Sequence, residues 1–431
     1  MYALLDGNNF YVSCERVFQP ALKGQAVMVL SNNDGCVISR SEEAKALGIR
    51  MGVPFFQVRH LVDAGQLVAL SANFALYGDM SDRMMSLAAG MGPQQEVYSI
   101  DECFIDLHGV RDITRRAWAI RERIGRGIGI ACCVGIAPTK TLAKLANHVA
   151  KEAERKPGSY PPELMRVCNL AELGAGKLQH VLQATAVGEV WGVGRRLSKR
   201  LQAMGIHTAQ DLASVPPALV RKHFGVVLER TVLELNGMAC MALDLQPQPR
   251  QQVACTRSFG QSVTDLPPLL EAVSAFAASA ATKLRSQGLL AGQLHVFAHT
   301  SPHRPGPRFY RSAQVQLEPP ASDTARLVEA AVRGMRSIYA PGYQLIKAGV
   351  ILQDLSPAHQ QQAALFGPGQ AHGRGALMQT LDVINQRWGK HMIHVGSAGQ
   401  TGSDDGSWRM KQAHRTPRYT TRLDEVPVCK C

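Results

Sequence analysis

Two adjacent carboxylates, Asp101 and Glu102, interrupt an apolar run at residues 97–107. A third carboxylate, Asp6, ends the apolar run at residues 2–5. Charge is costly to bury in such surroundings unless something neutralises it. Carboxylate oxygens suit hard divalent cations, above all Mg²⁺, which also binds substrate phosphates. Two such ions about 3.5–4 Å apart support in-line phosphoryl transfer in many enzymes. The three carboxylates therefore predict a site for metal-dependent phosphoryl transfer.

The positions of these carboxylates along their strands decide whether they meet. Successive side chains in a straight strand point to opposite faces, so Asp101 and Glu102 converge only at a strand end or in a tight hairpin. A strand end beside Asp6 completes a three-carboxylate cluster. The alternative for an Asp-Glu pair is a solvated turn, and the apolar neighbours Ile100 and Phe104 weigh against it.

The elements around the carboxylates mix strands with helices. The apolar residues 130–136 predict a buried strand. It leads into a helix from about residue 139 to residue 153, with Lys140 and Lys144 one turn apart on one face. This mixture predicts an α+β core that carries its carboxylates at strand ends.

A stretch predicted to be wholly helical, residues 166–240, contains a glycine hairpin that opens a basic helix. Gly192 and Gly194 precede Arg195 and Arg196. Backbone N–H groups at the positive end of a helix bind phosphate without reading bases. The alternative is a plain glycine turn between two helices, and the surrounding basic residues argue against it. The hairpin therefore predicts contacts to a nucleic-acid backbone.

Composition points to the same class of partner. The net charge of +13 favours a polyanion, nucleic acid first and an anionic membrane second. No apolar run of about 20 residues is present to span a membrane, and the N-terminus does not resemble a signal peptide. The ten cysteines have no C-x-x-C spacing, which argues against zinc and for reduced thiols. We therefore expect a cytoplasmic protein.

A polar, proline-broken linker at residues 245–252 precedes a second module. Residues 253–353 predict the element order βαββαβ of a split ferredoxin-like module. Ten Lys or Arg against five Asp or Glu in residues 251–352 favour a sheet face that follows phosphates. The remaining residues, 354–431, predict a tail that begins as a tether and ends in a basic run.

Three motifs in order give the chain a resemblance to a known family. They are Asp6–Glu15, Tyr98–Phe104 and Gly135–Ala146. With the hairpin that follows them, they resemble the signatures of the Y-family translesion DNA polymerases over nearly the whole chain. Ser31–Val37 and Pro417–Arg422 narrow the resemblance to the UmuC-type branch, the catalytic subunits of bacterial DNA polymerase V.

The resemblance implies a multidomain right-hand polymerase. Its parts are a ferredoxin-like palm at 1–20 and 74–165, a small fingers insertion at 21–73, a helical thumb with a helix-hairpin-helix at 166–244, a βαββαβ little finger at 253–353 and a tail at 354–431. The implied activity is error-prone, template-directed addition of dNTPs to a primer 3′ end in the SOS response, without proofreading. By the matching positions, Asp6, the Gly7 carbonyl, Asp101 and Glu102 hold two Mg²⁺ ions.

The resemblance also implies a set of nucleotide-binding residues. Tyr11, beside Phe10, matches a steric gate whose ring clashes with a 2′-hydroxyl; its alternative is a buried aromatic. Lys151 and Lys45 match residues that contact the triphosphate, although both could be surface lysines.

One departure lies in the same region: many members carry a tyrosine before the run Glu-Ala-Arg of the fingers, whereas this chain has Ser41-Glu42-Glu43-Ala44-Lys45. An acid at position 42 repels phosphate, and Arg40 is expected to share the nucleotide contact.

The implied partners are primer-template DNA, a sliding clamp, a processed UmuD-like dimer and a RecA filament, with the protein at the nucleoid when active. Gln362, Leu365 and Phe366 match the pattern by which bacterial polymerases dock on the clamp. Two alternatives remain open. A two-metal nuclease or cyclase shares the carboxylates but does not account for Tyr11 and the hairpin together. A non-catalytic DNA-binding scaffold leaves the three carboxylates unexplained.

Overall fold

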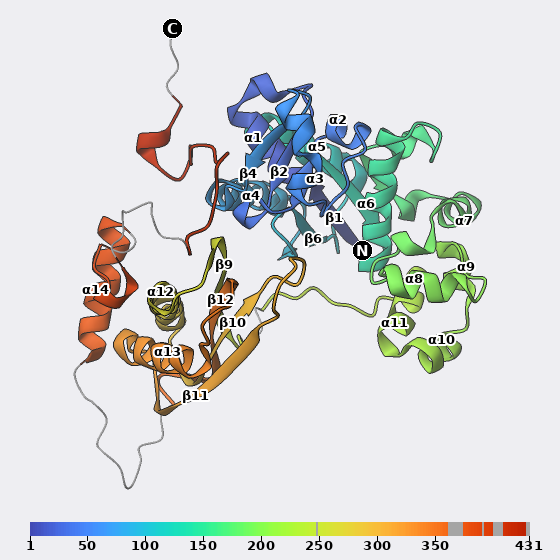
Figure 1. The fold of residues 1–431 in the computed structure, drawn as a ribbon. Coiled ribbons are helices and arrows are strands. Elements are labelled where there is room, and N and C mark those ends of the chain that lie inside the picture. Colours follow the sequence, from blue (N-terminus) through green and yellow to red (C-terminus); the bar gives the residue numbers. More distant parts are fainter. Residues whose placement is uncertain (247–248, 361–373, 390–391, 400–407, 428–431) are drawn as a thin grey trace. The chain divides into compact units, whose positions relative to one another are not determined.

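The computed structural model describes residues 1–246, 249–360, 374–389, 392–399 and 408–427 (Figure 1). The chain divides into two compact units. The first contains residues 1–31, 36–247 and 414–431, and the second contains residues 32–35 and 248–413. Within the described ranges, every helix is too short or too polar to cross a membrane.

The first unit is built on a five-stranded sheet with the order β5-β6-β1-β7-β8. The strands are β1 (Tyr2–Gly7), β5 (Gln94–Val97), β6 (Glu102–Asp106), β7 (Cys132–Ala137) and β8 (Val167–Asn169). Helices α4 (Phe74–Ala88) and α5 (Ile113–Ile128) cover one face, and α6 (Lys140–Arg155) covers the other. Alternate residues of β1 divide between the faces, with Ala3 and Leu5 toward α4 and α5 and Leu4 toward α6. The sheet therefore has two buried faces, and its mixture of strands and helices confirms the predicted α+β core.

A smaller mixed sheet with the order β3-β2-β4 belongs to the same unit, with β2 antiparallel to β3 and parallel to β4. Its strands are β2 (Val27–Leu30), β3 (Val37–Arg40) and β4 (Val68–Ser71), accompanied by α1 (Phe10–Phe18), α2 (Glu42–Ala46) and α3 (Phe55–Asp63). Ser41 caps α2, since its hydroxyl accepts a hydrogen bond from the Ala44 N–H at 3.2 Å.

The prediction that residues 166–240 are wholly helical is wrong at its start. Residues 167–169 form β8, which pairs in parallel with β7 and extends the main sheet. All three residues of β8 are buried, so they show no alternation, and only the neighbouring strand makes them extended. The rest is helical, with α7 (Ala175–Ala184), α8 (Arg195–Gln202), α9 (Ala209–Ser214), α10 (Pro217–Phe224) and α11 (Val226–Leu235).

A buried carboxylate, that of Glu234, connects the helical region to helix α6 on the main sheet. Glu234 of α11 accepts hydrogen bonds from the N–H and the hydroxyl of Thr141, at 2.9 and 2.7 Å. It also accepts from two backbone N–H groups, those of Cys240 and Met241. A buried carboxylate with this many donors is satisfied, and it fixes α11 against the start of α6.

The second unit contains a four-stranded antiparallel sheet with the order β11-β10-β12-β9. Its elements are β9 (Val253–Val263), α12 (Leu266–Arg285), β10 (Leu289–Thr300), β11 (Tyr310–Ala321), α13 (Thr324–Ile338) and β12 (Leu345–Pro357). The predicted order βαββαβ is therefore confirmed. Helices α12 and α13 pack side by side on one face of the sheet (Figure 1). The tail, for which no helix was predicted, adds α14 (Arg374–Trp388).

Candidate functional site

Strand pairing places two of the three predicted carboxylates opposite each other. Asp6 of β1 and Glu102 of β6 are Cα partners, and directly opposed side chains lie on the same face of a sheet. Both residues share the parity of Leu4 and Phe104, which face α6. Asp101 lies in the turn between β5 and β6, where its carbonyl accepts from the Gly7 N–H at 2.8 Å. The predicted hairpin placement of Asp101 and Glu102 is thus confirmed.

Helix α6 supplies a lysine to each of these two strand carboxylates. The Lys151 ammonium lies 2.5 Å from Oδ2 of Asp6, and the Lys144 ammonium lies 2.6 Å from Oε2 of Glu102. The helix comes this close because β7 carries Gly135, where a Cβ atom would lie 2.1 Å from the backbone nitrogen of Asn147. Any side chain at position 135 would push α6 and its lysines away from the carboxylates.

Burial disfavours the ionised form of Asp6. The residue is only 7% exposed, and burial raises its pKa to about 7, with Lys151 opposing the rise and Glu102 and Asp101 adding to it. Desolvation disfavours a carboxylate charge, and a nearby cation restores it. The site is therefore one in which additional positive charge is favourable.

The third carboxylate, Asp101, is held within its own turn. The Ser99 hydroxyl donates to its Oδ1 at 2.6 Å and is itself approached by the backbone N–H of Glu102 at 3.1 Å. Among the residues that the structure describes, no group of three or more His, Cys, Asp or Glu side chains is gathered closely enough to hold a metal ion. Like charges repel, and each strand carboxylate here pairs with a lysine instead. The donor chemistry nevertheless fits a hard divalent cation, because the three side chains offer carboxylate oxygens and burial makes additional positive charge favourable at Asp6.

Aromatic rings stand beside the carboxylates. Tyr11, at the start of α1, stacks on Tyr77 of α4 with a centroid distance of 4.5 Å and an interplanar angle of 18°. Phe74 meets the Tyr11 ring edge-on at 6.0 Å, and Phe10 lies at 6.1 Å. Burial, followed by the charge of Asp101, raises the pKa of Tyr11, which places its hydroxyl in the field of that carboxylate. Tyr77 was not predicted, because only the packing of α4 on α1 brings it here.

Glu42 forms hydrogen bonds and ion pairs with polar and basic side chains around it. Its Oε1 accepts from Lys45 at 2.7 Å and from Asn9 at 2.9 Å, and Arg155 lies 3.1 Å away. Burial raises the pKa of Glu42, but the hydrogen bonds from Lys45 and Asn9 and the charge of Arg155 outweigh it and lower the pKa overall. The Arg40 guanidinium instead donates to the Ile49 carbonyl at 2.6 Å.

Sequence reasoning missed Arg155, and it placed Lys144 on a face of this helix without giving it a role at the site. Both lie on α6, as does Lys151, at spacings of seven and four residues. Repeats of four and seven residues return to one helix face, so the three cations could have been grouped from their spacing alone.

The predicted hairpin leads into a helix that presents its basic residues to solvent. Gly192 has φ of +89°, a conformation that favours glycine, and Gly194 precedes the first residue of α8. Arg195 and Arg196 are exposed at that end. Neighbouring Trp191 packs edge-on to Tyr98 at 5.6 Å, and Tyr98 precedes the carboxylate turn. The hairpin and the carboxylates are thus connected through an aromatic contact.

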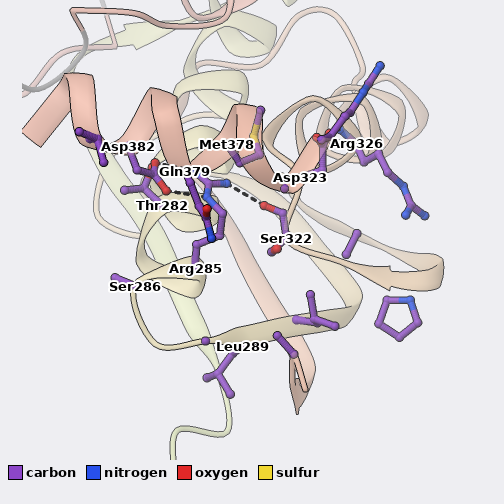
Figure 2. A pocket seen from close by; sticks show the side chains of 18 of the residues that line it. Thr282, Arg285, Ser286, Leu289, Ser322, Asp323, Arg326, Met378, Gln379 and Asp382 are labelled. Atoms are coloured by element: carbon purple, nitrogen blue, oxygen red, sulfur yellow. Dashed lines mark hydrogen bonds and ion pairs between the residues drawn. The ribbon is translucent and has the colours of Figure 1, made fainter. Parts of the chain in front are cut away.

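A pocket of about 1260 Å³ in the second unit does not involve the predicted site residues. It lies where α14 meets α12, and Figure 2 shows Arg285 between Asp382 and the backbone of Ser322. Both guanidinium–carboxylate contacts are 2.7 Å, which is the bidentate geometry that fixes one helix on another. The predicted clamp residues Gln362, Leu365 and Phe366 lie outside the described residues.

Comparisons with known proteins match three segments of the chain. Residues 5–148 match the impB/mucB/samB family, residues 250–365 match the C-terminal domain of that family, and residues 375–429 match a domain of unknown function, DUF4113. Protein UmuC of Salmonella typhimurium is 42% identical over 431 residues, covering 99% of this chain and 99% of that protein.

DNA polymerase IV of Moorella thermoacetica is 28% identical over 411 residues, covering 91% of this chain and 94% of that protein. Among solved structures, a Y-family DNA polymerase chimera of Dbh and Dpo4 aligns with a TM-score of 0.62 at 20% identity. The alignment covers 83% of this chain and 99% of that one, and it shows a shared fold.

Proposed function

Because the chain belongs to the impB/mucB/samB family, we propose that it is an error-prone, template-directed DNA polymerase that carries out translesion synthesis. This membership confirms the family predicted from the three motifs. The observation that carries the proposal is the cross-strand pair of Asp6 and Glu102 with Asp101 in the adjoining turn. These carboxylates lie in a fold that aligns with a Y-family polymerase.

The parts of the chain take the roles of a right hand. The five-stranded sheet with α4, α5 and α6 is the palm, and the small sheet at residues 21–73 is the fingers. The helices from α7 to α11 form the thumb, and the βαββαβ module is the little finger, with the tail after it. The fit is supported by the sheet orders and by the boundary between the two compact units, which falls in the predicted linker.

Asp6, Asp101, Glu102 and the Gly7 carbonyl are the proposed ligands of two Mg²⁺ ions. Metal ions held by these residues would supply activation of the primer 3′-hydroxyl and neutralisation of charge on the triphosphate. The chain's own contribution is to hold the carboxylates on one sheet edge and to supply cations from α6. Lys151 and Lys144 form ion pairs with Asp6 and Glu102. If the two carboxylates bound metal instead, the lysine ammonium groups would be free to bind phosphate oxygens of the substrate.

The rings and basic groups beside the carboxylates form the proposed nucleotide pocket. Tyr11 is the steric gate under the sugar, with Phe10 next to it. Lys151, Lys45 and Arg155 face the triphosphate, supported by their convergence near Asp6 and Glu42. Arg40 is the weaker candidate, because its guanidinium already donates to the chain.

The charge of Glu42 opposes the binding of triphosphate, and its removal is expected to strengthen that binding. In Glu42→Gln the amide oxygen still accepts from Lys45 and Asn9, but the negative charge is gone. The side chain is half exposed, so screening limits the effect to about 1 kcal/mol, or roughly a fivefold decrease in the KM for dNTP. Steady-state single-nucleotide incorporation measures this. Arg155→Gln removes the positive charge of the ion-pair partner of Glu42 and should raise the KM for dNTP. An unchanged KM in both variants contradicts the placement of these two residues near the triphosphate.

Contacts to DNA and to partners complete the proposal. The exposed Arg195 and Arg196 follow the primer-template backbone, with Gly192 and Gly194 letting phosphate approach the start of α8. Gln362, Leu365 and Phe366 dock on a sliding clamp. A processed UmuD-like dimer and a RecA filament activate the enzyme at the nucleoid in the SOS response. These partners follow from the resemblance to UmuC-type proteins, and no proofreading is expected.

Primer extension tests the proposal directly. The protein is given undamaged and abasic templates with Mg²⁺, alone and with sliding clamp, processed UmuD-like dimer and activated RecA. Extension past the abasic site that a chelator abolishes supports a translesion polymerase. No extension under any of these conditions, with DNA binding intact, favours a non-catalytic scaffold.

A further inference from the structure

The C-terminal segment of the chain returns to the first unit and packs beside α1 and β4. The His414 carbonyl accepts from the Ser71 N–H at 3.0 Å, so this segment continues the hydrogen bonding of β4. Five residues later, Tyr419 stacks on Phe18 of α1 with a centroid distance of 4.6 Å and an interplanar angle of 7°. We call residues 414–419 the strap. They lie in the region that matches a domain of unknown function.

The centre of the strap is tied to two helices through buried polar groups. Thr416 is 7% exposed, and its hydroxyl donates to Oε1 of Glu15 on α1 at 3.2 Å. The side-chain amide of Asn73 donates to the Thr416 hydroxyl at 3.0 Å and to the Pro417 carbonyl at 2.9 Å. The Asn73 side-chain oxygen caps α4, because it accepts from the Leu76 N–H at 3.4 Å. The strap therefore joins the start of α4 to α1.

Glu15 carries this connection to the nucleotide pocket. Its carboxyl is fully buried, and the same Oε1 that accepts from Thr416 accepts from the Tyr77 hydroxyl at 2.7 Å. The Tyr77 ring is the surface on which Tyr11 stacks. Four side chains in sequence thus connect the tail to the proposed gate: Thr416, Glu15, Tyr77 and Tyr11. None of these contacts depends on residues outside the first unit.

We propose that the strap is a specificity element of the polymerase, which positions Tyr11 through Glu15 and Tyr77 and thereby sharpens the discrimination between dNTPs and rNTPs. The inference rests on the proposed role of Tyr11 as a gate. A ring excludes a 2′-hydroxyl only while its position is fixed. A displacement of about 1 Å is enough to weaken the selectivity of a site that depends on precisely positioned groups. Without the Thr416 hydroxyl, the buried Glu15 carboxyl loses a donor and holds the Tyr77 ring less firmly.

Thr416→Val tests the strap in the full-length protein, because valine keeps the shape of threonine and removes its hydroxyl. The measurement is kcat/KM for a dNTP and for the matching rNTP opposite the same template base. We expect the dNTP/rNTP ratio to fall about three- to tenfold, the effect of weakening one buried hydrogen bond. Thr416→Ser restores the hydroxyl and should restore the ratio. Leu423→Ala, at a residue 91% exposed in the same tail, is the matched control and should leave the ratio unchanged.

Equal losses for both nucleotides in Thr416→Val would mean that the strap only stabilises the fold, and would overturn the proposal. Tyr11→Ala tests the role of Tyr11 as the gate separately from the role of the strap. If Tyr11→Ala leaves the ratio unchanged, the gate itself fails and the strap's role in specificity falls with it. If only Thr416→Val is without effect on the ratio, the strap fails while the polymerase assignment stands.

Hydrogen–deuterium exchange gives a readout independent of catalysis. Thr416→Val should speed exchange of the α1 amides (Phe10–Phe18) and of the first turn of α4, and Leu423→Ala should not. Unchanged exchange in these two elements overturns the proposal whatever the activity of the protein.

Discussion

Replacing Asp101 by alanine is expected to lower primer extension by about a thousandfold or more, because it removes a proposed ligand of the ions that stabilise the transferring phosphate. Asp101 is the best of the three carboxylates for this test. It is half-buried in a turn, and its side chain is hydrogen-bonded only to Ser99 among the described residues. Alanine there leaves no buried charge without a partner. Single-turnover incorporation of the correct dNTP measures the loss.

Asp6 would be a poorer choice for the same purpose. Its removal leaves the partly buried Lys151 ammonium without its carboxylate partner; breaking a fully buried pair costs about 3–5 kcal/mol, and this partly exposed one somewhat less. A lower activity of Asp6→Ala would therefore combine misfolding with lost chemistry. For Asp101→Ala, an unchanged melting temperature and unchanged affinity for primer-template DNA serve as controls. Full activity in that variant would remove Asp101 from the metal site.

Tyr11→Ala is expected to relax sugar discrimination by roughly 10- to 200-fold, the range that a single steric contact with a substrate usually provides. The ring of Tyr11 is stacked on Tyr77 and flanked by Phe74, so it forms a firm wall rather than a mobile side chain. Alanine opens the space that a 2′-hydroxyl needs. The ratio of kcat/KM for dNTP to that for rNTP, on one template, reports the change.

Tyr11→Phe is the matched control for this second prediction. It retains the ring and deletes only the hydroxyl, so discrimination should remain close to that of the wild type if the ring itself excludes the 2′-hydroxyl. A large loss of discrimination in Tyr11→Phe would show that the phenolic oxygen acts instead, by hydrogen bonding. Unchanged discrimination in Tyr11→Ala would leave the ring with a packing role only.

The features predicted from the sequence were those with local signals. The pattern of residues 253–353 predicted the βαββαβ order, and the apolar residues around Asp101 and Glu102 predicted a strand end or a hairpin for this pair. By contrast, β8 has three buried residues and becomes a strand only through its partner β7. Short elements that depend on one neighbour carry almost no signal of their own.

The contacts around the carboxylates depended on packing between distant segments. Nothing local pairs Lys151 with Asp6, because the two residues are far apart in the sequence and meet only when α6 settles over Gly135. The same holds for Thr416 and Glu15, which are 401 residues apart. The charge of Glu42 and its helical neighbour Lys45 are visible in the sequence, but its distant partner Arg155 became visible only in three dimensions.

The carboxylate of Glu234 also affects how the first unit comes apart. It binds Thr141 of α6 and the chain that follows α11, while Glu96 of β5 binds Lys140 at 2.6 Å and the Asp244 N–H at 2.9 Å. Opening either contact while its carboxylate stays buried would leave a charge without its donors, at a cost of several kcal/mol. Under denaturant, we therefore expect the helices α7 to α11 and the sheet that carries Asp6 and Glu102 to unfold together as one cooperative block.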